Sequence, residues 1–362
     1  MRVVGKAFAL LATIVVGCGL ALAGYLVVIG RQPLRLPAPQ GPFAVGRAGF
    51  DWVDSSREDP LAPTPGVRRE LMVWVWYPAE HRSAPRAPYF PEPLLSADRR
   101  LFLRGPITRL LIRDPGLVRS HSLDRPPMAG PGRYPVVIFR PGFGALALQY
   151  TTLAEDLASR GYVVVAADAP YSAGVVAFSD GRVVTRSPKG SPSTAGPRSN
   201  FDMLAAIWAA DSSFILGKLA DLDQDAASPF HDRLDLKRVG AFGHSFGGAA
   251  SAEFCAVDSR CSAAVDLDGL LFGRAQRDGV GKPFMLLLTD HSGDPDKEQA
   301  YADFRRVFHM LPPGRIAIEV RGTRHFNVSD MAFLRSPVFL SRAIRAIGPI
   351  DRRRGFTIVS DH

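Results

Sequence analysis

Most hydrophobic residues of the chain lie in short, almost uniformly apolar runs that end at proline, glycine or a polar residue. The Tyr-Val-Val-Val-Ala-Ala sequence of residues 162–167 is typical of them. Runs so short, and so rich in β-branched residues, predict strands that are buried on both faces of a sheet. The predicted strands cover residues 70–78, 135–139, 162–167, 236–242, 263–267, 283–288 and 315–320.

Predicted helices separate most of these strands. They cover residues 149–160, 200–219, 248–254 and 336–347, where apolar positions recur at helical spacing or small residues favour a helix. Ser199 and Asn200 are able to cap the second of these helices. Strands that alternate with helices predict an α/β fold, in which a mostly parallel central sheet carries helices on both faces.

Three segments interrupt the alternation. Residues 31–42 are rich in proline and glycine and are expected to form a linker, and residues 171–198 are expected to form a loop. Residues 79–134 look like an insertion with a basic amphipathic pattern. We expect that pattern to form a surface helix, and a segment that rests on a membrane or covers a functional site is the alternative. Its apolar residues are Leu101, Phe102, Leu103, Ile107, Leu110, Leu111 and Ile112, and its basic residues are Arg99, Arg100, Arg104, Arg109 and Arg113.

The first thirty residues predict passage across a membrane. Arg2 and Lys6 precede an uncharged apolar run over residues 7–29, and about 20 such residues span a bilayer as a helix. A signal anchor is favoured because the run is too long for an ordinary signal-peptide core. Cleavage after the Ala-Leu-Ala of residues 21–23 is the next interpretation, and lipoprotein processing at Cys18 is the third. All three predict a domain beyond the bacterial inner membrane, anchored in the periplasm or exported.

Composition supports one large globular domain after this segment. The chain has 362 residues, of which 46% are hydrophobic and 22% are charged. We expect a single domain over residues 43–350, followed by a C-terminal tail over residues 351–362. The net charge of +9 comes mostly from scattered arginines, without a nucleic-acid-binding signature. We therefore expect no nucleic-acid partner and a preference for anionic membrane surfaces. The sequence does not indicate an oligomeric state.

Two cysteines of the globular part are expected to form a disulfide. Cys255 falls near the end of the helix predicted after residue 245, and Cys261 falls at the start of the next strand. This separation is compatible with disulfide geometry, and the periplasm permits the bond. Two free buried thiols are the alternative. Two cysteines without a matching histidine cluster fall short of four ligands, so no metal site is predicted.

A candidate nucleophile stands between a predicted strand and a predicted helix. The sequence Gly-His-Ser-Phe-Gly-Gly of residues 243–248 contains a G-x-S-x-G pattern centred on Ser245. In a sharp strand-to-helix turn, the glycines leave room for the bend and for close packing of neighbouring strands. The hydroxyl then projects above the sheet at a helix N-terminus, where backbone N–H groups favour developing negative charge. We interpret Ser245 as a nucleophile, and an ordinary glycine-rich turn is the alternative.

A serine nucleophile needs a base to remove its proton and an acid to orient that base. In sheets of this kind the order along the chain is serine, acid, histidine, each at the carboxyl end of a strand. His325 directly follows the last predicted strand and is the predicted base. His244 is expected to point elsewhere, and His291 follows an earlier strand, where this fold more often places the acid. The remaining histidines, in linkers, on a helix or at the terminus, are His81, His121, His231, His309 and His362.

The residues alone leave the acid open. Asp268 follows one predicted strand, whereas Asp290 and Asp294 follow the next strand, which is the commoner position in hydrolases of this fold. Both loops are able to reach the same histidine, so three candidates remain.

The chain resembles the platelet-activating-factor acetylhydrolase family, the secreted and lipoprotein-associated type of α/β hydrolase. The resemblance covers about residues 69–335 and combines the nucleophile motif with three further motifs. These are Asp-Leu-Ala-Ser-Arg-Gly-Tyr at residues 156–162, Leu-Asp-Gly at residues 267–269 and Arg-Gly-Thr-Arg-His at residues 321–325. The resemblance implies that Asp268, the aspartate of the Leu-Asp pair, is the acid of a triad with Ser245 and His325.

Two backbone N–H groups are expected to form an oxyanion hole. One belongs to Phe246, the residue after the nucleophile, and the other to the loop at residues 140–144. The family usually has Ser-His-Gly-x-Gly in this loop, so the resemblance assigns the second donor to Phe143. Arg140 and Pro141 replace the Ser-His, which we expect to alter the bracing of the loop rather than the donor. Phe326 is predicted to line an acyl pocket with the other two phenylalanines; three phenylalanines in one core are the alternative.

Together these observations predict a serine ester hydrolase that works through an acyl-enzyme intermediate and uses no metal or organic cofactor. The resemblance implies phospholipid substrates with short or oxidised acyl chains. A general carboxylesterase or a cutinase-like polyester hydrolase, with the same nucleophile motif, is the first alternative. A catalytically inactive hydrolase fold that serves as a binding module is the second. Such proteins usually lose the serine or the histidine, and this chain keeps both.

Overall fold

The computed structural model describes residues 2–80, 84–105, 108, 112–193, 196–295, 297–311, 314–334, 342 and 345–361. Some sequence predictions lie outside these residues. They concern most of the helix predicted over residues 336–347, part of the amphipathic pattern (Ile107, Arg109, Leu110 and Leu111) and the histidines His81 and His362.

The predicted α/β fold is confirmed. Among the described residues, nine strands form one sheet in the order β13-β12-β11-β10-β6-β7-β3-β2-β5. The parallel strands are β6 (Tyr134–Arg140), β7 (Val163–Ala167), β10 (Leu234–His244), β11 (Cys261–Leu267), β12 (Phe284–Thr289) and β13 (Ile316–Val320). The antiparallel pair β2 (Ala44–Glu58) and β3 (Arg68–Ala79) follows them, and the short β5 (Leu123–Asp124) completes the edge.

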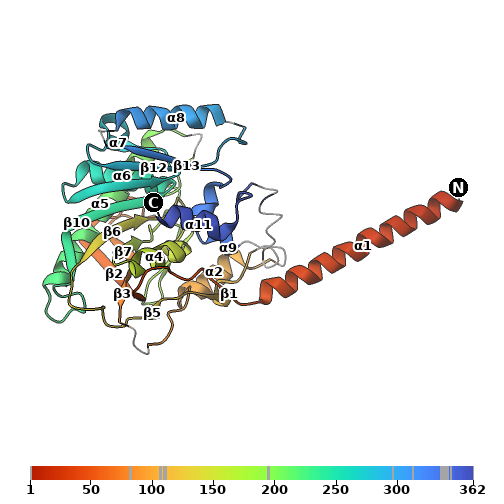
Figure 1. Ribbon diagram of the computed structural model, residues 1–362, viewed down its shortest axis with the longest axis horizontal. Coiled ribbons are helices and arrows are strands. Elements are labelled where there is room, and N and C mark those ends of the chain that lie inside the picture. The colour runs from red at the N-terminus through yellow and green to blue at the C-terminus, as the bar shows by residue number, and fades with distance from the viewer. Residues whose placement is uncertain are drawn as a thin grey trace.

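Helices cover both faces of the sheet (Figure 1). One face packs against α5 (Ser199–Gln224), α6 (Phe246–Val257), α7 (Gly273–Asp278) and α8 (Lys297–Met310). The other packs against α2 (Leu94–Phe102), α4 (Thr151–Ser159), α9 (Met331–Leu334) and α11 (Arg352–Asp361). Strand β7 is buried along its whole length, because Val163 and Val165 face the first group of helices and Val164 and Ala166 face the second.

The arrangement of the parallel strands brings distant parts of the sequence together. Strands β6, β10, β11, β12 and β13 run in the same direction, so the loops that leave their carboxyl ends meet at one edge. These loops carry residues 141–144, Ser245, Asp268, residues 290–294 and residues 321–325. All the residues predicted for catalysis therefore start from the same edge of the sheet.

Segments on both sides of the predicted domain pack against it. In the predicted linker, β1 (Leu34–Arg35) pairs with β4 (Val118–Arg119), and Leu36 is buried. In the predicted tail, α11 buries Phe356 and Val359 against the core. Each segment packs against the domain through a few apolar side chains. The prolines or arginines around them interrupt the apolar pattern, so the sequence does not predict this packing.

The inserted and loop segments also contain regular structure. The insertion holds α2, the 3₁₀ turn η1 (Pro115–Leu117), β4 and β5, and the predicted loop after β7 holds the hairpin of β8 (Val175–Ala177) and β9 (Val183–Thr185). Two further 3₁₀ turns, η2 (Ala147–Tyr150) and η3 (His325–Val328), follow strand ends. The first residues of the amphipathic pattern, up to Phe102, lie in α2, which buries Leu94 and Ala97.

Helix α1 (Arg2–Arg31) extends away from the globular domain (Figure 1). Within Leu10–Arg31, an 18-residue stretch has a mean hydropathy of 2.3 and only 6% of it is buried, as in a signal sequence or a membrane anchor. Helix α5 is also long and apolar, but it is half buried against the sheet, as expected of a core helix.

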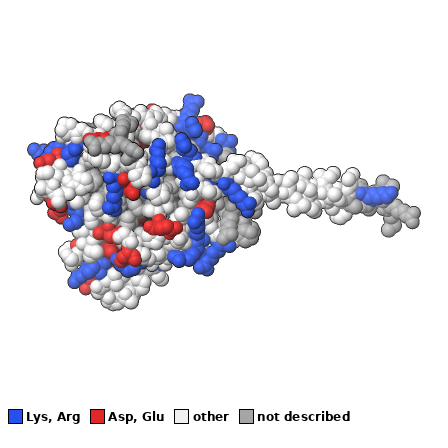
Figure 2. Space-filling model, turned by 90° about the horizontal axis from the view of Figure 1, so that it is seen from below, with Lys and Arg blue, Asp and Glu red and all other residues white. Residues whose placement is uncertain are grey.

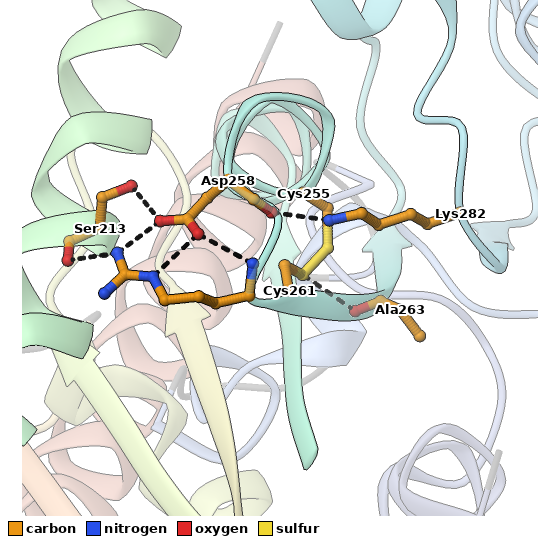
Figure 3. Close-up of a disulfide and its surroundings, with 7 residues drawn as sticks. Ser213, Cys255, Asp258, Cys261, Ala263 and Lys282 are labelled. Carbon is orange, nitrogen blue, oxygen red and sulfur yellow. Dashed lines mark hydrogen bonds and ion pairs between the residues drawn. A yellow bond between two sulfur atoms is a disulfide. The ribbon is translucent and has the colours of Figure 1, made fainter. Parts of the chain in front are cut away.

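A disulfide joins Cys255, near the end of α6, to Cys261, the first residue of β11, with their Cα atoms 5.1 Å apart (Figure 3). The turn between them is fixed by Asp258, whose carboxylate accepts hydrogen bonds from Ser213 Oγ at 2.8 Å and Arg260 Nη2 at 2.6 Å. These bonds, that from Arg260 first, lower the pKa of Asp258 to about 2. The helix that follows Ser245 is therefore covalently tied to the neighbouring strand.

Candidate active site

Ser245 lies in a strained turn between β10 and α6. Its backbone has φ 57° and ψ −126°, a combination that residues with a side chain rarely adopt. The flanking glycines permit the turn, because a Cβ at Gly243 would overlap Gly247 and a Cβ at Gly247 would overlap the carbonyls of Arg140 and Pro141. The sharp turn therefore presents Ser245 at the N-terminus of α6, as the motif predicts.

His325 and Asp268 are hydrogen-bonded to each other. Nδ1 of His325, in the turn η3, lies 2.7 Å from Oδ2 of Asp268, which follows β11. The same carboxylate accepts hydrogen bonds from the backbone N–H of Thr289 at 2.8 Å and from its hydroxyl at 2.7 Å. Because Nδ1 of His325 faces the carboxylate, Nε2 is the nitrogen left to exchange a proton with a nucleophile.

A second histidine, which sequence reasoning did not assign to the site, also contacts Asp268. Nε2 of His291 lies 2.9 Å from Oδ1 of Asp268, and Nδ1 of His291 lies 2.8 Å from Oδ2 of Asp294. Arg345 in turn donates to Asp294 at 3.0 Å. Since both ring nitrogens face carboxylate oxygens, His291 satisfies both acceptors only as an imidazolium.

The electrostatics of the cluster follow from this arrangement. Hydrogen bonding to Asp268, against the opposing effect of burial, raises the pKa of His291 to about 9. Burial alone would raise the pKa of Asp268, but the hydrogen bonds and charges of His291 and His325 hold that pKa well below its usual range. Asp268 therefore stays ionised although its side chain is fully buried.

The structure gives different partners to the three aspartates that the sequence left as candidates for the acid. Asp268 contacts His325, whereas Asp294 contacts His291. Asp290 accepts hydrogen bonds from the hydroxyl of Ser292 at 2.5 Å and from the backbone N–H of Gly322 at 2.9 Å, so it joins the loops after β12 and β13. In this geometry, Asp268 is the carboxylate placed to orient His325.

An open pocket of about 630 Å³ lies over these residues. Ser245, Asp268 and His325 all line it, so the three come together at one cavity. Its apolar walls are formed by Phe143, Phe201, Phe246, Leu270, Phe272 and Phe304. Phe326 is not among the described residues that line it, and its ring packs edge-on against His325 with centroids 5.4 Å apart.

The loop after β6, which carries Phe143, is braced from two sides. The hydroxyl of Tyr150 accepts a hydrogen bond from the N–H of Gly142 at 3.1 Å and lies 2.7 Å from Nδ1 of His244. Burial and then the nearby His325 lower the pKa of His244 to about 3, so this ring is neutral. The His244 side chain thus supports the loop, but it does not point away from the site as expected, because its ring centre lies 4.4 Å from that of His325.

Arg140, which stands where the family motif has serine, is the second brace. Its guanidinium is fully buried, 4.9 Å from the ring centre of Trp208 and 3.6 Å from Oδ2 of Asp211. Asp211 is shared with Arg69, whose Nη2 donates at 2.6 Å. The buried contacts of Arg140 with Asp211 and Trp208 thus hold this loop. They take the place of the Ser-His pair that the family motif has there.

Within the described ranges, no group of histidine, cysteine, aspartate or glutamate residues could hold a metal ion. A serine at a strand-to-helix turn, followed along the chain by an acid and a histidine at one edge of a parallel sheet, defines an α/β hydrolase. The chain matches the sequence profile described as "Platelet-activating factor acetylhydrolase, isoform II" over residues 29–179 and 204–361. It therefore belongs to this family.

Individual relatives carry related names. A probable 1-alkyl-2-acetylglycerophosphocholine esterase from Arthroderma benhamiae is 28% identical over 257 residues, which are 68% of this chain and 62% of that protein. Platelet-activating factor acetylhydrolase from Cavia porcellus is 22% identical over 363 residues, 92% of this chain and 78% of the relative. The solved structure of a ferulic acid esterase from Streptomyces cinnamoneus superimposes with a TM-score of 0.73, at 28% identity, over 91% of this chain and 90% of the other.

Proposed function

We propose that this protein is a serine ester hydrolase that acts on phospholipid-type esters with short or oxidised acyl chains. One observation supports the chemistry most directly: the Asp268–His325 hydrogen bond of 2.7 Å opens onto the same pocket as the strained Ser245. The family and the names of the relatives support the class of substrate.

The proposed reaction begins at Ser245. Nε2 of His325 accepts the hydroxyl proton while Oγ forms a bond to the ester carbonyl carbon, and the carbonyl oxygen becomes an oxyanion. Collapse of this intermediate breaks the bond to the alcohol, which leaves with the proton from His325. Water then attacks the acyl-enzyme, His325 again takes and returns a proton, and the carboxylic acid departs from Ser245.

The oxyanion of each intermediate needs fixed donors. We propose the backbone N–H groups of Phe246, at the start of α6, and of Phe143, in the braced loop. Both residues line the pocket, with ring centres 6.1 Å apart. The contacts of Tyr150, His244 and Arg140 described above support a fixed position for this loop.

His291 is proposed as a positioning residue for the acid. It contacts Oδ1 of Asp268 whereas His325 contacts Oδ2, and both of its ring nitrogens face carboxylates, so it is not placed to take the proton of Ser245. An imidazolium there keeps Asp268 ionised and fixes the plane of the carboxylate, and the carboxylate then fixes the ring of His325.

The residues that line the pocket support the proposal that the acyl group is small and apolar. Phe143, Phe246 and Phe272 line the pocket together with Ser245, and α8 contributes Ala300 and Phe304 to its wall. Arg198 also lines the pocket, with its guanidinium 4.6 Å from the ring centre of Phe272, and it offers a cation to a substrate phosphate.

The place of action is proposed from α1 and the disulfide. An apolar helix at the N-terminus supports an inner-membrane anchor with the globular domain in the periplasm, or export of the domain. The Cys255–Cys261 bond supports an oxidising compartment, because cytosolic thiols are kept reduced.

Turnover of three substrates tests the proposal. Wild type and Ser245→Ala are compared on p-nitrophenyl acetate, a long-chain p-nitrophenyl ester and an sn-2 acetyl phospholipid. We expect the wild type to cleave both acetyl esters faster than the long-chain ester, and Ser245→Ala to be inactive. Preference for the long-chain ester would contradict the substrate class, and equal activity of the two proteins would contradict the nucleophile.

A general carboxylesterase is the second candidate, which the similarity to the ferulic acid esterase favours. In that case hydroxycinnamate and simple acetate esters would be cleaved at least as well as the phospholipid. The same assay, extended with methyl ferulate, separates the two functions.

A further inference from the structure

A second cavity lies where α1 joins the globular domain. It has a volume of about 310 Å³ and shares no lining residue with the pocket over Ser245. Arg35 from β1, Arg119 and His121 from the region of β4, and Arg86 from the insertion supply its polar side chains. The other described lining residues are Ala87, Pro88, Val118 and Ser120.

The charge of this cavity is uncompensated. Arg35 and Arg119 are direct register partners in the parallel β1–β4 pair, and like charges opposite one another repel. The described lining residues include no carboxylate. Glu155 is the nearby acid, but it is fully buried behind the wall, where its Oε1 accepts the backbone N–H of His121 at 2.8 Å.

Hydrogen bonds to the backbone orient two of the arginines. Nη1 of Arg86 donates to the carbonyl of His121 at 2.6 Å, and Nη1 of Arg119 donates to the carbonyl of Gly116 at 2.8 Å. Each guanidinium has five N–H donors, so these contacts leave further donors for an anion. Planar guanidinium groups converging on one cavity suit the oxygens of a phosphate.

The cavity also lies close to the end of the apolar helix. Helix α1 ends at Arg31 and β1 begins at Leu34, so the chain reaches Arg35 within four residues, or about 14 Å at full extension. The headgroup layer is about 5–7 Å thick on each side of the hydrocarbon core. Figure 2 shows basic side chains gathered on the end of the domain from which α1 leaves.

We propose that the cavity formed by Arg35, Arg86, Arg119 and His121 binds the phosphate of an anionic phospholipid headgroup. The inference that a lipid supplies the phosphate rests on the membrane anchoring of α1 proposed above. The inference that the cavity binds a phosphate does not. Neither depends on the hydrolase activity. A bound headgroup gives the domain a second attachment to the membrane, in addition to α1, and so fixes its orientation on the bilayer.

Lipid binding to the full chain in an uncharged detergent tests this proposal. Native mass spectrometry measures binding of diether phosphatidylglycerol, which has no ester to cleave, beside diether phosphatidylcholine and inorganic phosphate. We expect preferential binding of phosphatidylglycerol. Arg35→Gln/Arg119→Gln should weaken that binding about tenfold or more, because each basic residue near an anionic lipid contributes to affinity.

The control removes the same number of charges elsewhere. Arg277→Gln/Arg305→Gln changes two exposed arginines on α7 and α8 and should leave binding unchanged. Arg86→Gln is the second test variant if the double variant unfolds at a lower temperature than the wild type. Equal binding of both lipids, or unchanged binding by Arg35→Gln/Arg119→Gln and Arg86→Gln, would overturn the proposal. Binding of inorganic phosphate alone would overturn the lipid assignment.

Discussion

At the scale of single residues, Asp268 combines complete burial with a full set of hydrogen-bond donors. Its Oδ1 faces the N–H of Thr289 and Nε2 of His291, and its Oδ2 faces the hydroxyl of Thr289 and Nδ1 of His325. Donors on both oxygens stabilise the charged form against the cost of burial. The carboxylate is therefore both ionised and fixed in orientation.

Replacement of this carboxylate should reduce turnover far more than replacement of its neighbour. For Asp268→Asn we expect kcat to fall by about 10³–10⁴-fold, because an amide presents His325 with the wrong hydrogen-bonding partner. Asp294→Asn, the matched control, should lower kcat by less than about tenfold, since Asp294 contacts His291 and not His325. The two kcat values on p-nitrophenyl acetate check this, and loss of activity in Asp294→Asn alone would reject Asp268 as the acid.

The raised pKa of His291 predicts a pH dependence of stability. A group whose pKa rises on folding stabilises the protein fully below its unfolded pKa and loses that contribution as pH passes the folded pKa. For His291 the window runs from the ordinary value of 6.5 to about 9. Relative to His291→Gln, the wild type should lose about 1–2 kcal/mol across this window, after allowance for partial solvent screening.

Urea unfolding of wild type and His291→Gln at pH 6 and pH 10 measures this difference. His309→Gln, which removes an exposed histidine from α8, is the control and should follow the wild type at both pH values. A wild-type advantage of the same size at both pH values would show that His291 is not the titrating group.

At the scale of elements, the turn from β10 into α6 depends on glycine at two positions. A Cβ at Gly247 would meet the carbonyls of Arg140 and Pro141, which are backbone atoms of the loop proposed for the oxyanion hole. Neither strand can move away freely, because β6 and β10 are paired along residues 136–140. The turn, the loop and the two strands are thus packed as one unit.

Gly247→Ala should consequently destabilise the protein and reduce turnover together. We expect a loss of about 1–3 kcal/mol in unfolding free energy, the usual cost of overpacking. Gly217→Ala is the control, because nothing lies within 4 Å of the added Cβ in the middle of α5. That substitution should stabilise by about 0.5–1 kcal/mol, and an equal effect of both changes would contradict the packing described.

The Cys255–Cys261 disulfide is a second feature of α6 whose effect on the free energy of unfolding is measurable. Cys255 and Cys261 are six residues apart, and closing so short a loop in the unfolded chain contributes about 2 kcal/mol. Cys255→Ala/Cys261→Ala should lower the unfolding free energy by about that amount, and dithiothreitol should then have no further effect on thermal unfolding. A double variant as stable as the wild type would contradict this stabilising role.

The elements differ in how far the sequence predicts them. Strands β6, β7, β11 and β12 and the second half of β10 are largely buried, so their apolar runs are visible in the sequence. The edge strand β13 is mostly exposed but keeps enough apolar residues to be predicted. Strand β2 was missed because glycine and charged residues interrupt its pattern, although it pairs with β3 over most of its length. Helix α8 was missed because it buries only Phe304 and Val307. A helix that buries so few side chains has too few apolar positions for a helical repeat to be recognised in its sequence.

The site shows the same distinction between local and tertiary information. Ser245 and His325 are predicted from a motif and from their position after a strand, which are local features. The choice of Asp268 over Asp294 required the family resemblance, because the loops after β11 and β12 start side by side. The His291–Asp268 contact joins these two loops, and no pattern in either loop indicates it.

At the scale of the whole molecule, the two proposed sites are separate and share no described lining residue. The proposed ester site lies at the carboxyl edge of the parallel strands, and the basic cavity lies at the base of α1. With α1 in a bilayer, the second attachment proposed here would hold the domain at a fixed orientation to its lipid substrates. The proposed substrate class and the proposed location would then reinforce each other.

The central claim is that Ser245 is a nucleophile activated by His325. Its most direct test is labelling with a fluorophosphonate, followed by mass spectrometry of the peptide that contains Ser245. We predict an adduct on Ser245 in the wild type and in Asp294→Asn, and at least about a hundredfold slower labelling in His325→Ala. Absence of an adduct on Ser245 in the folded wild type, or labelling of His325→Ala at the wild-type rate, would contradict the account.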